Sequence, residues 1–194
     1  MWNTRRKNHE ATDCTKNLYF FLSSWSFSKW GLNIIRPFSP GKGQCKFLLV
    51  RVDYFTKWIE VKPLAGITTQ NVQNFIWKNI ICLFCIPRVF IIDNSLQFID
   101  RGLSEFYEGL GIKHVTISVE HSQTNREAEV GNRVILNELN KRLDTVKGKW
   151  IKELIEVLWA YRCTPQTSTL NTPYSLTYGI EAMIPIELGL PSLR

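Results

Sequence analysis

The fold is decided by the stretch Arg88-Val89-Phe90-Ile91-Ile92-Asp93, an apolar run that ends on a carboxylate. A short run of β-branched and aromatic residues of this kind predicts a buried strand. After polar residues, the pattern around Gly102 to Leu110 predicts a helix that Gly111 ends, and Ile112 to Ile117 predicts another strand. Strand, helix and strand in this order are typical of parallel strands joined by a helix.

Two runs nearer the N-terminus predict antiparallel strands. Trp30 to Arg36 and Lys46 to Asp53 are separated by the turn-forming residues Ser39-Pro40-Gly41-Lys42-Gly43, which favours a β-hairpin. A third strand is expected at Trp58 to Lys62, and Pro63 should end it because proline has no N–H to donate to a ladder.

Three longer segments have helical periodicity. Thr68 or Thr69 is expected to cap a helix that runs to about Phe84. Further helices are expected from about Asn125 to Leu143 and from Lys149 to Cys163. The predicted fold class is α/β, a mixed five-stranded sheet with helices on both faces. The first helix should turn one set of residues to the core: Val72, Phe75, Ile76, Ile80 and Leu83.

Length and composition fit one globular domain. The chain has 194 residues, of which 44% are apolar and 21% are charged, which is ordinary globular usage. The net charge of +7 favours a polyanionic partner only slightly, and most of the excess lies in residues 1–50. Charged residues and a proline interrupt the longest apolar stretch, Phe75 to Ile92, so no membrane partner is expected.

Five widely spaced cysteines favour reduced thiols in an intracellular protein over a disulfide framework. Cys82 and Cys85 form a Cys-x-x-Cys pair, but no second Cys or His pair lies at zinc-finger spacing. We interpret the pair as part of an apolar helical stretch rather than as a zinc or redox site. The tryptophans other than Trp2, including Trp77, Trp150 and Trp159, are expected mostly in the core.

Two carboxylates are placed where they can meet. Asp93 follows a buried strand, and the carboxyl ends of strands are where α/β sheets bind ligands. Glu129 lies in the first turn of a predicted helix, and 129 − 93 − 1 = 35 residues separate the two. The intervening helix, strand and loop allow both carboxylates to converge at one edge of the sheet.

The segments Ile91 to Phe98 and His121 to Glu129 resemble the second and third acid motifs of retroviral and retrotransposon integrases, and the 35-residue gap is that family's signature. The resemblance is to the catalytic core of gypsy-type elements and covers about residues 23–192. Four more segments match in the family's order: Trp30-Gly31-Leu32-Asn33, Val52-Asp53-Tyr54-Phe55-Thr56-Lys57-Trp58, Trp159-Ala160-Tyr161-Arg162 and Thr172-Pro173-Tyr174.

The resemblance implies a ribonuclease-H-like fold in which three acids bind two Mg²⁺ or Mn²⁺ ions for 3′-end processing and strand transfer on DNA. Asp93 and Glu129 would be metal ligands and catalytic residues. The first acid, three residues after the tryptophan, is replaced by Asn33, a neutral side chain that cannot bridge two cations as a carboxylate does. Impaired catalysis is therefore expected, and whether the chain is an active enzyme stays open.

Further site residues follow from the same resemblance. Gln123, Asn125 and Arg133 correspond to positions that face DNA, although Arg133 could instead pair with Glu129 four residues earlier. Asp53 lies on the second strand and is expected to form hydrogen bonds at a strand end rather than to bind metal. Four loop positions depart from the family's usual residues and deepen the expected impairment: Ser95, Ser122, Arg126 and Glu127.

The expected organisation is a basic tail (1–28), a catalytic core (29–165) and a C-terminal extension (166–194), with no evident zinc-binding or C-terminal DNA-binding module. The expected partner is DNA, with a possible homo-oligomer, no membrane and no small-molecule substrate, and the expected location is intracellular, in the nucleus. One alternative is a non-catalytic nucleic-acid-binding or oligomerisation module with this fold. Another is a different ribonuclease-H-like nuclease that uses Asp53 or Asp100 as its third acid.

Overall fold

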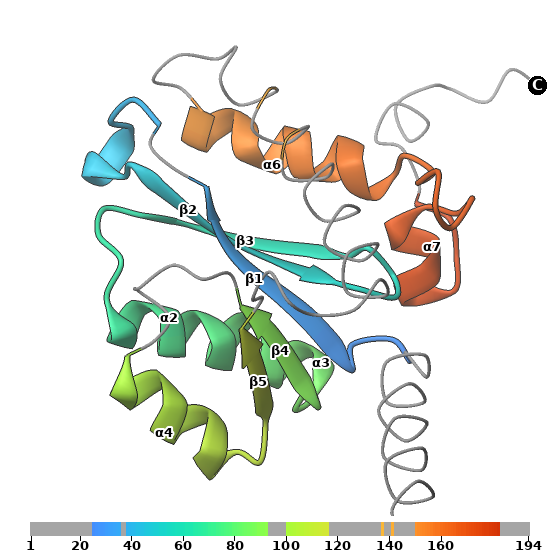
Figure 1. Ribbon diagram of the computed structural model, residues 1–194. Helices are drawn as coiled ribbons and strands as arrows, with labels where there is room; N and C mark the ends of the chain where they lie inside the picture. Colours follow the sequence, from blue (N-terminus) through green and yellow to red (C-terminus); the bar gives the residue numbers. More distant parts are fainter. Residues whose placement is uncertain are drawn as a thin grey trace, which may run out of the picture.

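The structure is a computed structural model that describes residues 25–35, 38–92, 100–116, 137, 141 and 150–182. A mixed five-stranded sheet lies at its centre, with strand order β3-β2-β1-β4-β5 (Figure 1). The strands are β1 (Lys29–Ile35), β2 (Phe47–Asp53), β3 (Ile59–Leu64), β4 (Val89–Ile92) and β5 (Lys113–Thr116). The predicted sheet is confirmed.

The sheet is antiparallel on one side of β1 and parallel on the other. β1 pairs with β2, and β2 with β3, in antiparallel register, whereas β1 with β4 and β4 with β5 are parallel. The predicted hairpin is confirmed, and its connection contains the short helix η1 (Lys42–Gln44). The prediction that Pro63 ends β3 was wrong, since the strand continues to Leu64. β3 is an edge strand, and an edge tolerates a residue that lacks an N–H.

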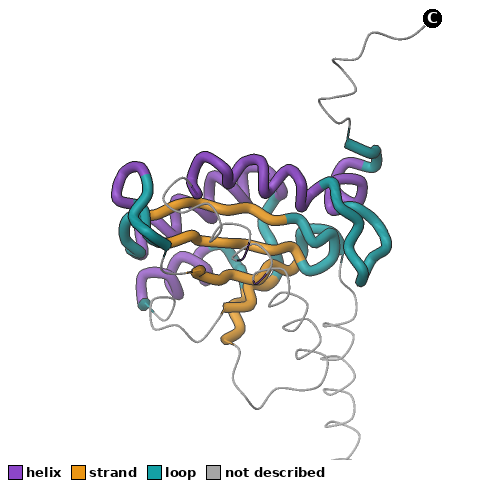
Figure 2. Tube along the Cα trace, turned by 90° about the horizontal axis from the view of Figure 1, so that it is seen from above, coloured by secondary structure: helices purple, strands orange, loops and turns teal. Residues whose placement is uncertain are grey.

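Helices cover both faces of the sheet. One face carries α2 (Thr69–Ile76), the π-helical turn η2 (Trp77–Ile81), α3 (Cys82–Phe84) and α4 (Arg101–Gly109), and the other carries α6 (Trp150–Arg162). A short helix, α7 (Pro173–Tyr178), follows α6. Figure 2 shows the same elements from above, with the strands side by side. No helix in the described part of the chain is long and apolar enough to span a membrane.

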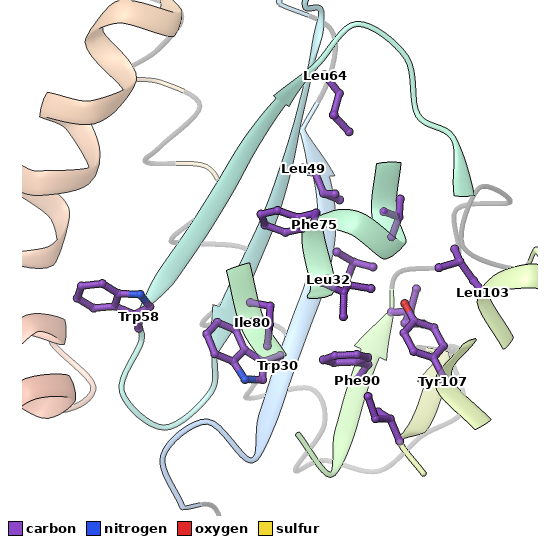
Figure 3. Packing of buried hydrophobic residues seen from close by; sticks show 14 residues of the cluster. Trp30, Leu32, Leu49, Trp58, Leu64, Phe75, Ile80, Phe90, Leu103 and Tyr107 are labelled. Atoms are coloured by element: carbon purple, nitrogen blue, oxygen red, sulfur yellow. The ribbon is translucent and has the colours of Figure 1, made fainter. Parts of the chain in front are cut away.

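The helix after β3 begins as predicted, because the Thr68 side chain accepts a hydrogen bond from the Asn71 N–H. Four residues of its predicted apolar face, Val72, Phe75, Ile76 and Ile80, are fully buried in the cluster of Figure 3. Leu83 was predicted wrongly, since its side chain is 61% exposed. The π-helical turn changes the phase of the helix, so that Phe84 rather than Leu83 packs against the core.

A second cluster lies between the sheet and α6. Leu48, Val50 and Val52 of β2 meet four residues of α6 spaced by three or four: Trp150, Leu154, Leu158 and Tyr161. At the start of α6 the Trp150 ring stacks on Phe38 at 4.6 Å, and its indole N–H donates to the Ser39 carbonyl at 3.0 Å. The hairpin connection and α6 are thereby locked together.

Side chains at the start of α6 also lie close to Gly41. A Cβ added there would lie 2.6 Å from Ile151 Cδ1 and 3.2 Å from Trp150 Nε1. We expect Gly41→Ala to lower the free energy of unfolding by about 1–3 kcal/mol through overpacking, measured by urea denaturation. Gly66→Ala is the matched control, because an added Cβ at Gly66 meets nothing within 4 Å. Equal effects of the two substitutions would contradict this account of the contact.

The six tryptophans that the structure describes divide evenly between core and surface. Trp30 and Trp58, with Trp150, are buried as predicted. Trp25, Trp77 and Trp159 are 64%, 48% and 36% exposed, so the prediction of a core position was wrong for Trp77 and Trp159. Both side chains point away from the sheet on helices whose opposite face supplies the core contacts.

The helix α7 was not predicted, although its sequence carries clear end signals. The Thr172 side chain accepts a hydrogen bond from the Ser175 N–H, Pro173 occupies the first helical position, and Gly179 ends the helix with a φ of +76°. These are the usual signals for a helix start and stop. At six residues, the helix is too short for apolar periodicity to reveal it.

Candidate active site

The candidate site lies beside the last described residues of β4, where β4 pairs with β1. The last registered pair of these parallel strands is Leu32 with Ile92, and β1 continues to Ile35. Asn33 is the next residue of β1 after this last described pair, and on its other side it pairs with Val50 of β2. β2, which follows β1 in the chain, lies on one side of β1, and β4 lies on the other. The strand order therefore changes direction at β1, and α/β sheets bind ligands at the strand ends beside such a switch point.

Asn33 is half-buried, and its side-chain oxygen already accepts a hydrogen bond from the Ile34 N–H at 2.9 Å. The amide carries no charge, whereas Mg²⁺ prefers charged oxygen ligands. Among the described residues, no group of three His, Cys, Asp or Glu side chains is placed to hold a metal ion. Asn33 is thus a poor fit for a first metal ligand.

The other predicted site residues lie outside the described residues. These are the carboxylates Asp93 and Glu129 and the predicted DNA contacts Gln123, Asn125 and Arg133. Their roles stay predictions. The departures at Ser95, Ser122, Arg126 and Glu127 also lie outside the described part.

Asp53 is a fully buried carboxylate with a structural role. Its Oδ1 accepts a hydrogen bond from the Phe27 N–H at 3.0 Å, and its Oδ2 accepts two from Thr56, from the N–H and the hydroxyl, each at 2.8 Å. The interpretation of Asp53 as a hydrogen-bonding residue is confirmed. Asp53 pairs with Trp30, three residues from Asn33 along β1, which corresponds to about 10 Å of strand.

The other candidate for a third acid also has a local role. The Asp100 side chain caps α4 by accepting a hydrogen bond from the Gly102 N–H at 2.7 Å. Asp53 and Asp100 therefore both use carboxylate oxygens to hold backbone, which disfavours a nuclease that uses either one as its third acid.

Burial is the largest influence on the Asp53 pKa and raises it, while hydrogen bonds from Thr56 and Phe27 and the charge of Lys57 oppose the rise. An acid whose pKa is raised by folding stabilises the fold most below its unfolded pKa and loses that contribution as pH rises through its folded pKa. The contribution of Asp53 to stability should therefore fall as pH increases from about 3.8, the ordinary value.

We expect Asp53→Asn to lower the free energy of unfolding by about 1–3 kcal/mol, because the amide nitrogen would face a backbone or hydroxyl donor. Urea denaturation of both proteins across acidic to neutral pH should show the difference between them shrinking as pH rises. Thr56→Ser keeps the hydroxyl bond to Asp53 and serves as a mild control. A difference that grows with pH would contradict the raised pKa.

Arg51 is a buried charged residue that sequence reasoning missed. It lies on β2, its side chain is 0% exposed, and its guanidinium sits 3.6 Å from the centre of the Phe90 ring. Burial lowers its pKa to about 10, which leaves it charged at neutral pH. The nearby Tyr107 hydroxyl opposes this lowering of the pKa, but neither the guanidinium nitrogens nor that hydroxyl forms a well-aligned hydrogen bond among the described residues. The only signal in the sequence is an arginine within an otherwise apolar strand.

No protein-family model matches the chain. Two relatives are similar to it in sequence. Human gypsy retrotransposon integrase-like protein 1 is 30% identical over 148 residues, which cover 75% of this chain and 28% of the relative. The Gag-Pol polyprotein of avian reticuloendotheliosis virus is 28% identical over 152 residues, which cover 78% of this chain and 13% of the relative. The chain thus corresponds to a minor part of each relative.

Two of the solved structures that share the fold are retroviral integrase cores. The catalytic core domain of BIV integrase superposes with a TM-score of 0.59 at 16% identity, covering 77% of this chain and 92% of that one. The catalytic core domain of HTLV-2 integrase, in complex with magnesium and in a trimeric form, gives 0.54 at 22% identity, covering 76% and 94%. Together the relatives and the fold confirm the resemblance seen in the sequence. The chain is thus related in sequence to gypsy retrotransposon integrase-like protein 1 and to a retroviral Gag-Pol polyprotein, and it has the ribonuclease-H-like fold of retroviral integrase catalytic cores.

Proposed function

We propose that the chain is an integrase core that binds DNA ends and has weak Mg²⁺-dependent 3′-end processing and strand-transfer activity. The observation that carries the proposal is the parallel register of β1 and β4, which pairs Leu32 with Ile92. One step further along each strand would bring Asn33 opposite Asp93. The candidate first and second metal ligands would then lie side by side on neighbouring strands, at a switch point of the sheet.

The proposed weakness follows from charge. The reaction attacks a phosphodiester with water or a 3′-hydroxyl, and bound divalent cations would supply charge stabilisation at the attacking and leaving oxygens. Asp93 and Glu129 would provide two negative charges to hold such ions, and Asn33 provides none. Because Asn33 fits the metal poorly, we assign it no part in any reaction step.

A second candidate is a DNA-binding or oligomerising module without catalysis. The hydrogen bond from the Ile34 N–H to the Asn33 side chain favours it, because the amide is then held by its own strand. Gln123, Asn125 and Arg133 would contact DNA in either case. Both candidates place the protein in the nucleus with DNA as partner, and assembly into oligomers would parallel the trimeric form of the HTLV-2 core.

The test uses the unmodified chain and a labelled DNA duplex with a recessed end, incubated with Mg²⁺ or Mn²⁺. We expect DNA binding that weakens as salt increases, because phosphate contacts release counterions. Cleaved and joined products should exceed the level seen with EDTA by a small amount. Absence of binding at low salt would overturn the proposed function, and strong metal-dependent joining would overturn the proposed weakness.

A further inference from the structure

Two exposed thiols lie at the end of the helical segment that precedes β4. Cys82 begins α3 and Cys85 follows its last residue, and both are free and exposed. Cys45 and Cys163, the other described cysteines, are half-buried and lie in other parts of the fold. The helical position matches the prediction from sequence, but the exposure of both thiols makes the pair accessible to small reagents and reopens the redox use that the sequence interpretation set aside.

The helical turn brings the two cysteines close together. The Cys85 N–H donates to the Ile81 carbonyl at 3.1 Å, so the turn is closed up to the Cys85 nitrogen. Residues three apart in a helix have Cα atoms about 5 Å apart, which falls within the range that a disulfide spans. Cys85 has φ 73° and ψ 179°, so no further helical turn restrains its side chain.

Phe84, between the two cysteines, fixes this turn from the core side. Its ring lies 4.6 Å from the ring of Phe27, 5.5 Å from that of Trp30 and 6.4 Å from that of Trp58. An anchored aromatic residue limits the movement of the turn, and a pair held in place has a higher effective concentration than the same pair in a mobile segment.

A metal site is the weaker use of this pair. No third His, Cys, Asp or Glu side chain joins it within the described part of the chain, whereas structural zinc takes four ligands. Thiol–disulfide exchange needs only two sulfurs within reach of each other. The geometry therefore favours exchange over chelation.

We propose that Cys82 and Cys85 form a dithiol site that closes reversibly to an intramolecular disulfide with small disulfides such as glutathione disulfide. One protein thiolate attacks a glutathione sulfur and releases the first glutathione as thiolate. The second protein thiol loses its proton and attacks the mixed disulfide, which releases the second glutathione. The protein loses two electrons and two protons, and one glutathione disulfide becomes two molecules of glutathione.

The test equilibrates the full chain with glutathione buffers of increasing oxidised fraction, blocks remaining thiols by alkylation and digests with trypsin. The peptide from Asn79 to Arg88 contains Cys82 and Cys85 and no other cysteine. We expect it to appear unalkylated and lighter by two hydrogen atoms than the reduced peptide. Cys163, which burial disfavours as a thiolate by raising its pKa, should stay alkylated under the same conditions.

Two comparisons decide the outcome. In Cys82→Ser and Cys85→Ser the remaining thiol should form a mixed disulfide and need about tenfold more glutathione disulfide for half oxidation than the pair does. In urea the unmodified chain should also need about tenfold more glutathione disulfide for half oxidation, because unfolding removes the turn that holds the two cysteines together. The proposal is wrong if the folded pair collects two separate glutathiones, or if urea leaves the requirement unchanged.

Discussion

An Asn33→Asp variant should process and join DNA ends roughly a hundredfold or more faster than the unmodified chain. The substitution restores a carboxylate at the residue of β1 that follows Leu32, the partner of Ile92 in β4. Divalent cations bind charged oxygens more tightly than amide oxygens, and about 1.36 kcal/mol of transition-state stabilisation corresponds to a tenfold rate increase. The measurement is a gel assay of labelled DNA with Mg²⁺ or Mn²⁺.

Two variants serve as controls for this rescue. Asn33→Ala should leave activity at the level of the unmodified chain, and Asn33→Asp combined with Asp93→Asn should lose the gain. Circular dichroism and DNA binding would verify that each variant folds. A folded Asn33→Asp variant that binds DNA without any gain in activity would contradict a dormant site and favour the non-catalytic module.

Arg51→Met should raise the free energy of unfolding by about 1–4 kcal/mol. A buried charge keeps most of its desolvation cost unless well-aligned hydrogen bonds offset it, and the Arg51 guanidinium has only the nearby Tyr107 hydroxyl and no such hydrogen bond among the described residues. Methionine fills a similar space, and its sulfur can keep a favourable contact with the Phe90 ring. Urea denaturation at neutral pH should show the higher midpoint without a change in slope.

Arg162→Met is the matched control, because Arg162 is also a largely buried arginine over an aromatic ring but has partners. Its Nη2 donates to the Ile59 carbonyl at 2.7 Å and to Glu60 at 3.2 Å, and its guanidinium lies 4.1 Å from the Trp58 ring. This substitution should lower the free energy of unfolding by about 1–3 kcal/mol. A loss of stability in Arg51→Met as large as that in Arg162→Met would show that the Arg51 charge is compensated.

Most of the fold could be predicted from the sequence, because the residue pattern and the tertiary structure agree along the hairpin and the β4–α4–β5 unit. The prediction of buried helical residues failed where a helical turn with one extra residue changes which side chains face the core. Leu83 has the spacing of a core residue in a regular helix, but the π-helical turn from Trp77 to Ile81 places Phe84 there instead. Hydrogen-bond pattern within a helix depends on packing, which residue type alone does not encode.

The candidate site could be predicted from the sequence less completely than the fold. The position of Asn33 beside the end of β4 follows from motif order, and the rejection of Asp53 followed from its place on the second strand. The missing partners of Arg51 could not be anticipated, because they depend on which groups share a face of the sheet. The exposure of Cys82 and Cys85 likewise depends on the phase of the helix that carries them.

The central claim is that Asn33 occupies the place of the first metal ligand beside Asp93 and Glu129. Its most direct test is a crystal structure of the Asn33→Asp variant soaked with Mn²⁺, with the metal located by anomalous scattering. The account predicts manganese at bonding distance, about 2.0–2.6 Å, from carboxylate oxygens of residues 33, 93 and 129. Manganese bound at Asp53 or Asp100, or residues 33, 93 and 129 too far apart to share an ion, would contradict it.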